Sequence, residues 1–286
     1  MSDRDRAARP AWDGVVEMPV RERLRKPRED GWTMVIDKGL GLNAIDDLMQ
    51  VAAPVIDVLK LSFGTSAFFV HDVLKEKVRT VTAHGVYCMP GGTFQEVAIW
   101  QGALDRYLDR ARELGFNAIE ISDGTIEMDA RTRADAIAQA VKAGFRVLSE
   151  VGKKDPADAQ PMAALAGTVN ADLDGGAFMV IMEAREAGKG VGIYDASGLP
   201  REAEIEAFLK GVRDPGRILW EAPLGPQQRY LVLRFGPNVN LGNVAPEDVL
   251  ALEALRCGLR GDTLKRAWQA RSGRPGVGDP SVPPLP

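Results

Sequence analysis

The sequence predicts an α/β fold, a single (β/α)8 TIM-type barrel flanked by mobile N- and C-terminal tails. Two observations predict it: eight short apolar runs alternate with helical patterns, and polar residues follow these runs. Alternation repeated this often favours a closed parallel barrel over an open sheet. We expect a tail at 1–20, the barrel at 21–265 and a Pro/Gly-rich tail at 266–286.

The expected strands are short apolar runs bounded by turn-forming residues. They are 33–37, 56–61, 84–88, 118–122, 146–151, 178–182, 218–221 and 239–241.

The segments between the strands carry residues that favour helix starts. These starts are Asn43 for a helix to Ala52, Thr93 with Glu96 for one long helix toward Leu114, Asp129 for a helix to Gly144, and Pro246 for a helix to Arg256. We interpret Glu96 as a helix-capping residue rather than a catalytic acid, because it lies three residues after Thr93.

Composition excludes several classes of protein. The net charge of −4 offers no basic surface for nucleic acid or an anionic membrane. Two cysteines and two histidines argue against a disulfide framework and a His-rich zinc site. No segment approaches about 18 uninterrupted apolar residues, and no signal peptide is evident. We therefore expect a cytoplasmic protein with small-molecule partners, which associates as a homo-oligomer.

Polar residues gather where the expected strands end. In a (β/α)8 barrel these carboxyl ends form the active-site face, so we expect a functional mouth there. The residues are Asp37, Lys38, Lys60, Gly91, Gly92, Thr93, Glu120, Ser122, Asp123, Glu150, Lys153, Lys154, Glu183, Arg185, Glu221, Asn240 and Asn243.

The densest charge cluster runs from Glu150 to Asp155, directly after an apolar strand. Such a cluster at a strand end indicates a ligand, a metal or a network of ion pairs. Lys153 and Lys154 could instead pair only with Glu150 and Asp155, and Arg185 could form a structural ion pair with Glu183 or Glu186. Position alone leaves these alternatives open.

An ordered series of motifs spans about 23–264. It comprises Lys26-Pro27-Arg28, Asp37-Lys38-Gly39, Lys60 with Gly64-Thr65-Ser66, Gly91-Gly92-Thr93, Ile119 to Thr125, Glu150 to Lys154, Glu183 to Glu186, Glu221-Ala222-Pro223, and Asn238 to Asn243. In this order they resemble the phosphosulfolactate synthase family, barrel enzymes of coenzyme M biosynthesis. Plant heat-stress-associated proteins resemble the same family.

The resemblance implies a carbon–sulfur lyase that uses Mg²⁺ to add sulfite to C3 of phosphoenolpyruvate. The reaction passes through an aci-carboxylate enolate and gives (2R)-3-phosphosulfolactate, in which the phosphate stays on C2. It serves coenzyme M or sulfolactate biosynthesis. The alternatives are a non-catalytic stress-associated relative and another enolate-forming lyase acting on a phosphorylated acid.

The chemistry of that reaction and the positions of the residues at the strand ends suggest roles for the residues of the mouth. Lys153 is the expected general acid, and Glu150, Lys60 and Arg185 complete the catalytic set. The expected substrate-binding residues are Lys38, Lys154, Gly92, Thr93, Ser122 and Asn240. The expected Mg²⁺ ligands are Glu120, Glu150 and Glu183, with Asp37 and Asp123 behind them.

Overall fold

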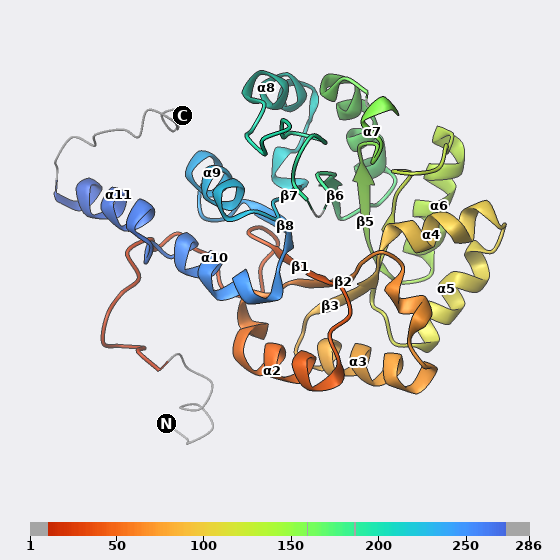
Figure 1. Ribbon diagram of the computed structural model, residues 1–286, viewed down its shortest axis with the longest axis horizontal. Helices are drawn as coiled ribbons and strands as arrows, with labels where there is room; N and C mark the ends of the chain where they lie inside the picture. Colours follow the sequence, from red (N-terminus) through yellow and green to blue (C-terminus); the bar gives the residue numbers. More distant parts are fainter. Residues whose placement is uncertain (1–10, 159, 186, 273–286) are drawn as a thin grey trace.

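Eight parallel strands form a nearly closed barrel surrounded by helices (Figure 1). The computed structural model describes residues 11–158, 160–185 and 187–272. The strands are β1 (Thr33–Asp37), β2 (Val58–Leu61), β3 (Tyr87–Pro90), β4 (Ala118–Ile121), β5 (Arg146–Val151), β6 (Met179–Met182), β7 (Ile218–Glu221) and β8 (Asn240–Val244). The predicted fold class is therefore confirmed.

The strands follow the order β3-β2-β1-β8-β7-β6-β5-β4. The two end strands, β3 and β4, meet through Asn117. Its Oδ1 accepts a hydrogen bond from Cys88 N at 2.7 Å, and its backbone N donates to Cys88 O at 3.4 Å. A side chain thus completes the barrel where a backbone ladder is lacking.

The helices surround the strands in sequence order, with α11 outside this ring beside α10 (Figure 1). They are α2 (Leu42–Ala52), α3 (His71–Ala83), α4 (Gly92–Trp100), α5 (Leu104–Glu113), α6 (Ala130–Lys142), α7 (Met162–Asp174), α8 (Glu202–Gly211), α9 (Gly225–Phe235), α10 (Val249–Arg256) and α11 (Gly261–Ser272).

Three predicted helix starts differ from the structure. The helix expected from Pro246 begins at Val249 as α10, after a single 3-10 turn at Pro246–Asp248. Helix α2 begins at Leu42, before Asn43, with no side-chain cap. The single helix expected from Thr93 is two helices, α4 and α5, because Gly102 adopts a φ of 60° between them.

The predicted cap of α6 and the predicted end of the barrel region can also be compared with the structure. Asp129 is the expected cap of α6, and its carboxylate accepts from Thr132 N at 2.7 Å. The expected end of the barrel region at 265 falls inside α11, whereas 1–10 and 273–286 lie outside the described residues.

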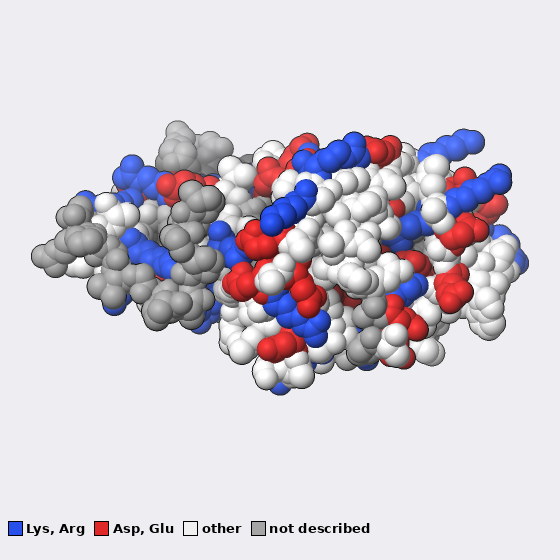
Figure 2. Space-filling model, turned by 90° about the horizontal axis from the view of Figure 1, so that it is seen from above, with Lys and Arg blue, Asp and Glu red and all other residues white. Residues whose placement is uncertain are grey.

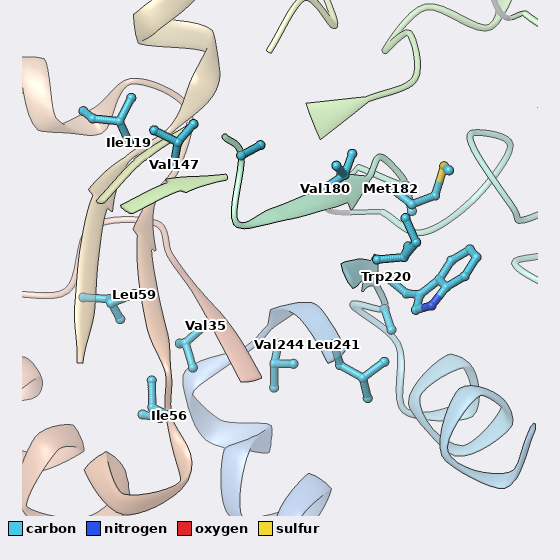
Figure 3. Close-up of a cluster of buried hydrophobic side chains, with 14 of the residues drawn as sticks. Val35, Ile56, Leu59, Ile119, Val147, Val180, Met182, Trp220, Leu241 and Val244 are labelled. Atoms are coloured by element: carbon cyan, nitrogen blue, oxygen red, sulfur yellow. The ribbon is translucent and has the colours of Figure 1, made fainter. Parts of the chain in front are cut away.

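Apolar side chains pack on both sides of the strands. Inside the barrel lie Met34, Val58, Met89, Leu148 and Leu219. Outside, side chains such as those labelled in Figure 3 point from the strands toward the helices. Because successive strand residues face opposite sides, each strand contributes to both layers.

The amino-terminal segment covers the end of the barrel where the strands begin. Val20 N donates to Cys257 O at 3.1 Å. Arg23 pairs with Glu253 at 2.8 Å, and Arg28 pairs with Asp57 at 2.7 Å. These contacts close one end, so the opposite end carries the mouth.

Basic and acidic side chains are interspersed over the face seen in Figure 2. Within the described ranges, every helix is too short or too polar to cross a membrane.

Candidate active site

Inward-facing positions change from apolar to charged within two residues at the carboxyl ends of the strands. The pairs are Val58 and Lys60 in β2, Ala118 and Glu120 in β4, Leu148 and Glu150 in β5, Ile181 and Glu183 at the end of β6, and Leu219 and Glu221 in β7. The period of two along a strand places these charges directly above the apolar interior.

Lys60 lies at the centre of these carboxylates. Its Nζ is 2.8 Å from Glu120 Oε2, 3.1 Å from Glu150 Oε2 and 3.4 Å from Glu221 Oε1. All four side chains are buried. A buried ammonium is stabilised only where several acceptors replace its water, and three carboxylates do so here. We call Lys60 with Glu120, Glu150, Glu183 and Glu221 the carboxylate ring.

The carboxylates of the ring titrate differently from one another. Burial raises the pKa of Glu120 to about 8, although Lys60 opposes the shift. Burial and the neighbouring Glu150 raise the pKa of Glu183 well above its usual value. Despite burial, Lys60 and Lys154 lower the pKa of Glu150. Glu150 is therefore the acid of the ring whose ionised form is favoured, whereas the protonated forms of Glu120 and Glu183 are favoured relative to a free carboxyl.

Lys154 is the second lysine at the mouth. Its Nζ is 3.5 Å from Glu150 Oε1, 3.6 Å from Glu96 Oε1 and 3.9 Å from Glu183 Oε2. It also donates to Thr93 Oγ1 at 3.1 Å. Although burial opposes the shift, Glu150 and Glu183 raise the pKa of Lys154, which therefore stays protonated.

A cavity of about 240 Å³ opens above the carboxylate ring. It is lined by Ile36, Lys60, Ser62, Phe63, Gly91, Gly92, Thr93, Glu120, Glu150, Lys154, Glu183, Arg185, Glu221 and Asn243. The non-glycine residues with positive φ in the described ranges are Phe63, Arg185 and Asn243, and all three line this cavity. Such strained backbone is concentrated at functional sites.

Arg185 lies at the exposed rim of the cavity. Its backbone N–H donates to Glu183 Oε1 at 2.5 Å, and its Nη1 donates to Lys154 O at 3.4 Å. Among the residues that the structure describes, no carboxylate forms an ion pair with this guanidinium. Glu183 therefore contacts the backbone of Arg185 and not its guanidinium. Glu186, the other acid considered as a partner, lies outside the described residues.

Lys153 points away from the cavity, which contradicts its predicted place at the mouth. Its Nζ donates to Asp123 O at 2.6 Å and to Ile126 O at 3.0 Å. Asp123 in turn pairs with Arg133 at 2.9 Å and lies 3.4 Å from Lys153. Lys153 and Asp123 therefore hold the loop after β4, and neither lines the cavity.

Three more predicted site residues lie elsewhere. Asp37 faces outward, where it pairs with Lys77 of α3 at 2.5 Å. Lys38 is exposed and outside the cavity lining. Asn240 begins β8, so its side chain bonds Trp32 N, Gly216 O and Ile218 O at the opposite end of the barrel. Asn243, three residues later, takes the place expected for Asn240.

Glu96 is not a helix cap. Helix α4 has no side-chain cap, and the buried Glu96 carboxylate accepts from Ser122 Oγ at 2.8 Å and from Thr125 N and Ile126 N at 2.9 Å. Ser122 is thus bonded to Glu96, outside the cavity lining. Glu96 fixes the loop after β4 and also faces Lys154.

Two backbone N–H groups at the start of α4 already donate hydrogen bonds within the protein. Gly92 N donates to Glu120 Oε1 at 3.0 Å, and Gly91 N donates to Leu61 O at 2.8 Å. A Cβ at Gly92 would lie 2.4 Å from Glu120 Oε1, so only glycine fits. Gly92 therefore positions Glu120 at the cavity.

The charges of the cavity fit a divalent cation. Its four lining carboxylates face two lysines, and Arg185 lies only at the rim. Glu150 and Glu183 lie close together, because Lys154 Nζ is 3.5 Å from the first and 3.9 Å from the second. The buried Asn243 Oδ1 has no hydrogen-bond partner. Oxygen donors of this kind suit Mg²⁺, which needs only one or two carboxylates.

Residues in the described ranges form no group of three His, Cys, Asp or Glu side chains in metal-binding geometry. The ammonium of Lys60 accounts for this, because it occupies the middle of the carboxylate ring. Glu150, Glu183 and Asn243 are therefore the residues that could hold Mg²⁺, together with water and substrate oxygens.

Two cavity residues, Glu221 and Asn243, lie at predicted strand ends but had no predicted role, and strand alternation could have identified the first. Glu221 was noted at its strand end but not as a partner of the other acids, although it occupies the inward position after Leu219. Lys154 lies four residues after Glu150 and Lys153 lies three residues after it. Side chains alternate along an extended chain, so Lys154 is expected on the side of Glu150 and Lys153 on the opposite side. Asn243 follows a register irregularity between β1 and β8, so alternation does not identify it.

Comparison with known proteins identifies relatives over most of the chain. A family model described as (2R)-phospho-3-sulfolactate synthase (ComA) matches residues 21–262. Phosphosulfolactate synthase of Methanothermobacter thermautotrophicus is 46% identical over 85% of this chain and 94% of its own. The enzyme of the same name from Methanocaldococcus jannaschii is 42% identical, over 86% and 99%. A plant protein of Arabidopsis thaliana, Protein HEAT-STRESS-ASSOCIATED 32, is 24% identical, over 82% and 88%.

Proposed function

Because this chain belongs to the (2R)-phospho-3-sulfolactate synthase family, an enzyme family, we propose that it adds sulfite to phosphoenolpyruvate above the carboxylate ring. The observation that carries the proposal is the joint presence of Glu150, Glu183, Lys154 and Arg185 around one cavity. Acids for a metal and cations for anionic substrates are both required by this reaction.

The proposed reaction balances without an oxidant or reductant. The sulfur lone pair of sulfite attacks C3 of phosphoenolpyruvate and forms the C–S bond. The electrons of the C2–C3 double bond move toward the carboxylate and give an aci-carboxylate enolate. A proton then reaches C2, and the phosphate stays on that carbon.

Two anions must meet in a cavity that is itself rich in carboxylates. Lys60 is committed to Glu120, Glu150 and Glu221, so it mainly holds the ring together. Lys154 and Arg185 are the cations left to contact substrates. A guanidinium suits bidentate binding of phosphate or carboxylate, and an ammonium suits a point contact.

We assign the predicted Mg²⁺ to Glu150, Glu183 and Asn243. Bound there, the ion supplies positive charge to substrate carboxylate oxygens as electrons move onto them. Glu150 stays ionised because Lys60 and Lys154 lower its pKa, although burial opposes the shift. Glu183 would release its proton on metal binding, because its raised pKa comes from burial and from Glu150.

We assign delivery of the proton at C2 to Lys154 in place of Lys153. Lys154 lines the cavity and stays protonated, since Glu150 and Glu183 outweigh the effect of burial on its pKa. The hydroxyl of Thr93 accepts one of its protons and Glu96 faces it, so the ammonium is oriented from two sides. General-acid catalysis requires this reach and orientation.

A direct assay tests the proposal against its alternatives. Purified protein with Mg²⁺ should consume phosphoenolpyruvate and sulfite in equal amounts, and neither substrate alone should disappear. Consumption of phosphoenolpyruvate without sulfite would favour another enolate-forming lyase. Binding of phosphoenolpyruvate and sulfite without turnover would favour a non-catalytic, stress-associated role.

A further inference from the structure

The end of the barrel opposite the mouth carries an aromatic cluster. Trp32 stacks on Tyr87 with ring centroids 5.5 Å apart, and its ring lies 4.8 Å from that of Phe178. Trp32 is buried, whereas Tyr87 and Phe178 line the surface hollow beside it. Aromatic faces of this kind bind flat, unsaturated groups.

Two arginines lie against this cluster. The guanidinium of Arg146 is 4.2 Å from the ring centre of Phe178 and 5.3 Å from that of Tyr87. The guanidinium of Arg217 is 4.7 Å from Phe178. Stacking on rings leaves the edges of each guanidinium free to donate hydrogen bonds.

Most N–H groups of the Arg146 guanidinium have no acceptor among the described residues. Its Nη2 donates a hydrogen bond to Tyr87 Oη at 3.0 Å. No carboxylate of the described residues forms an ion pair with it. Arg217 pairs with Glu29 at 3.1 Å, yet its buried Nη1 has no hydrogen-bond partner. Unsatisfied donors of this kind are costly unless something accepts from them.

Both arginines face space that could hold a ligand. Two adjoining hollows, of about 830 and 750 Å³, share Tyr87, Asn117, Arg146 and Phe178 in their linings. Both fall in the size range of small-molecule sites. The charged lining residues of the two hollows are Lys26, Arg28, Arg146, Arg213 and Arg217 against Glu29, Asp57, Asp174 and Asp214.

The ion pairs in this lining single out one cation. Arg28 pairs with Asp57 at 2.7 Å, and Arg213 pairs with Asp174 at 2.6 Å. Lys26 donates to the carbonyls of Ala53 and Gly85. Among the described arginines that line the two hollows, Arg146 is thus the one that forms no ion pair. We call the two hollows together the amino-end groove.

We propose that the amino-end groove binds a small organic anion. A sulfonate, phosphate or carboxylate group of the ligand accepts from Arg146, and a flat unsaturated portion packs against Tyr87 and Phe178. This site is separate from the carboxylate ring, which lies at the other end of the strands. It is therefore independent of the proposed reaction.

The test uses anilinonaphthalenesulfonate, a flat aromatic sulfonate whose fluorescence rises on binding. We expect saturable binding that weakens roughly tenfold or more in Arg146→Gln, because a charge-assisted hydrogen bond is lost. The matched control is Arg110→Gln, which removes an exposed arginine paired with Glu113 on α5 and should leave binding unchanged. Thermal melting checks that both variants are folded.

Three results would overturn the proposal. The first is equal binding of the probe to wild type and Arg146→Gln. The second is displacement of the probe by phosphoenolpyruvate, which would place it at the mouth. The third is a change of sedimentation coefficient in Arg146→Gln alone, which would make the groove an interface between copies of the chain. Loss of binding in Arg146→Gln without these effects supports the anion site.

Discussion

The ammonium of Lys154 lies 3.5 Å from the carboxylate of Glu150, four residues earlier in the chain. Both residues face the cavity, because Gly152 between them continues the alternation of β5 at a φ of 114°. The adjacent Lys153 faces the opposite way, toward Asp123. This relationship separates two neighbouring lysines into a substrate-facing one and a loop-anchoring one.

Lys154→Ala should lower kcat at least about 100-fold, the lower end for loss of a general acid. Lys153→Ala is its matched control and should lower kcat less than about tenfold, because Lys153 contacts only the loop after β4. Steady-state kinetics of both variants, with melting temperatures, measure the difference. A larger loss of turnover in Lys153→Ala would reverse the assignment.

Lys60→Met should lower the free energy of unfolding by about 3–5 kcal/mol, because it leaves buried carboxylates without their shared counter-charge. The double variant Lys60→Met with Glu120→Gln should recover part of this loss, since Glu120 is 2.8 Å from Lys60. Urea unfolding of the two variants checks the coupling. Strict additivity would show that the pair does not interact.

Stability without metal should fall as pH rises from about 5 to about 8. Burial raises the pKa of Glu120 to about 8 from 4.5, so the folded state binds more protons than the unfolded state across this range. Glu183 and Glu221, whose pKa values burial also raises, act in the same direction. Glu150, with a lowered pKa, instead loses its contribution as pH falls below 4.5.

Urea unfolding at several pH values measures this dependence. Glu120→Gln should flatten the decline, because the amide does not titrate. The control Glu247→Gln alters an exposed residue in the turn before α10 and should show the same change of stability with pH as the wild type. If the free energy of unfolding changes with pH by the same amount in all three proteins, Glu120 does not have this role.

Mg²⁺ should raise the melting temperature of the wild type. Glu150→Gln should need an Mg²⁺ concentration at least about tenfold higher for the same rise. Losing one carboxylate ligand removes charge as well as an oxygen donor. Glu247→Gln again serves as the control. An unchanged Mg²⁺ titration in Glu150→Gln would make Glu150 a partner of lysines only.

Much of the fold could be predicted from local patterns. The strands β1, β5 and β7 have the predicted bounds, since apolar runs bounded by turn residues identify buried parallel strands well. The split between α4 and α5 was missed because Thr93, Glu96 and the apolar spacing favour one helix. Gly102, which ends the first helix with a positive φ, was the available signal.

The site was predicted less completely, because its contacts join distant segments. Glu120, Glu150 and Glu183 lie at the cavity as expected. The sequence could not show that Lys60 meets carboxylates from three other strands, those of Glu120, Glu150 and Glu221. Glu96 has capping-box spacing, yet it bonds a loop some 30 residues later. Homo-oligomeric assembly and cytoplasmic location stay predictions.

The most direct test of the central claim follows the phosphorus and carbon signals of phosphoenolpyruvate by NMR during incubation with sulfite, Mg²⁺ and enzyme. Wild type should form a product with phosphate on C2 and sulfonate on C3, and Lys154→Ala should form it at least about 100-fold more slowly. Unchanged phosphoenolpyruvate with folded wild-type protein, or an equal rate in Lys154→Ala, would contradict this claim.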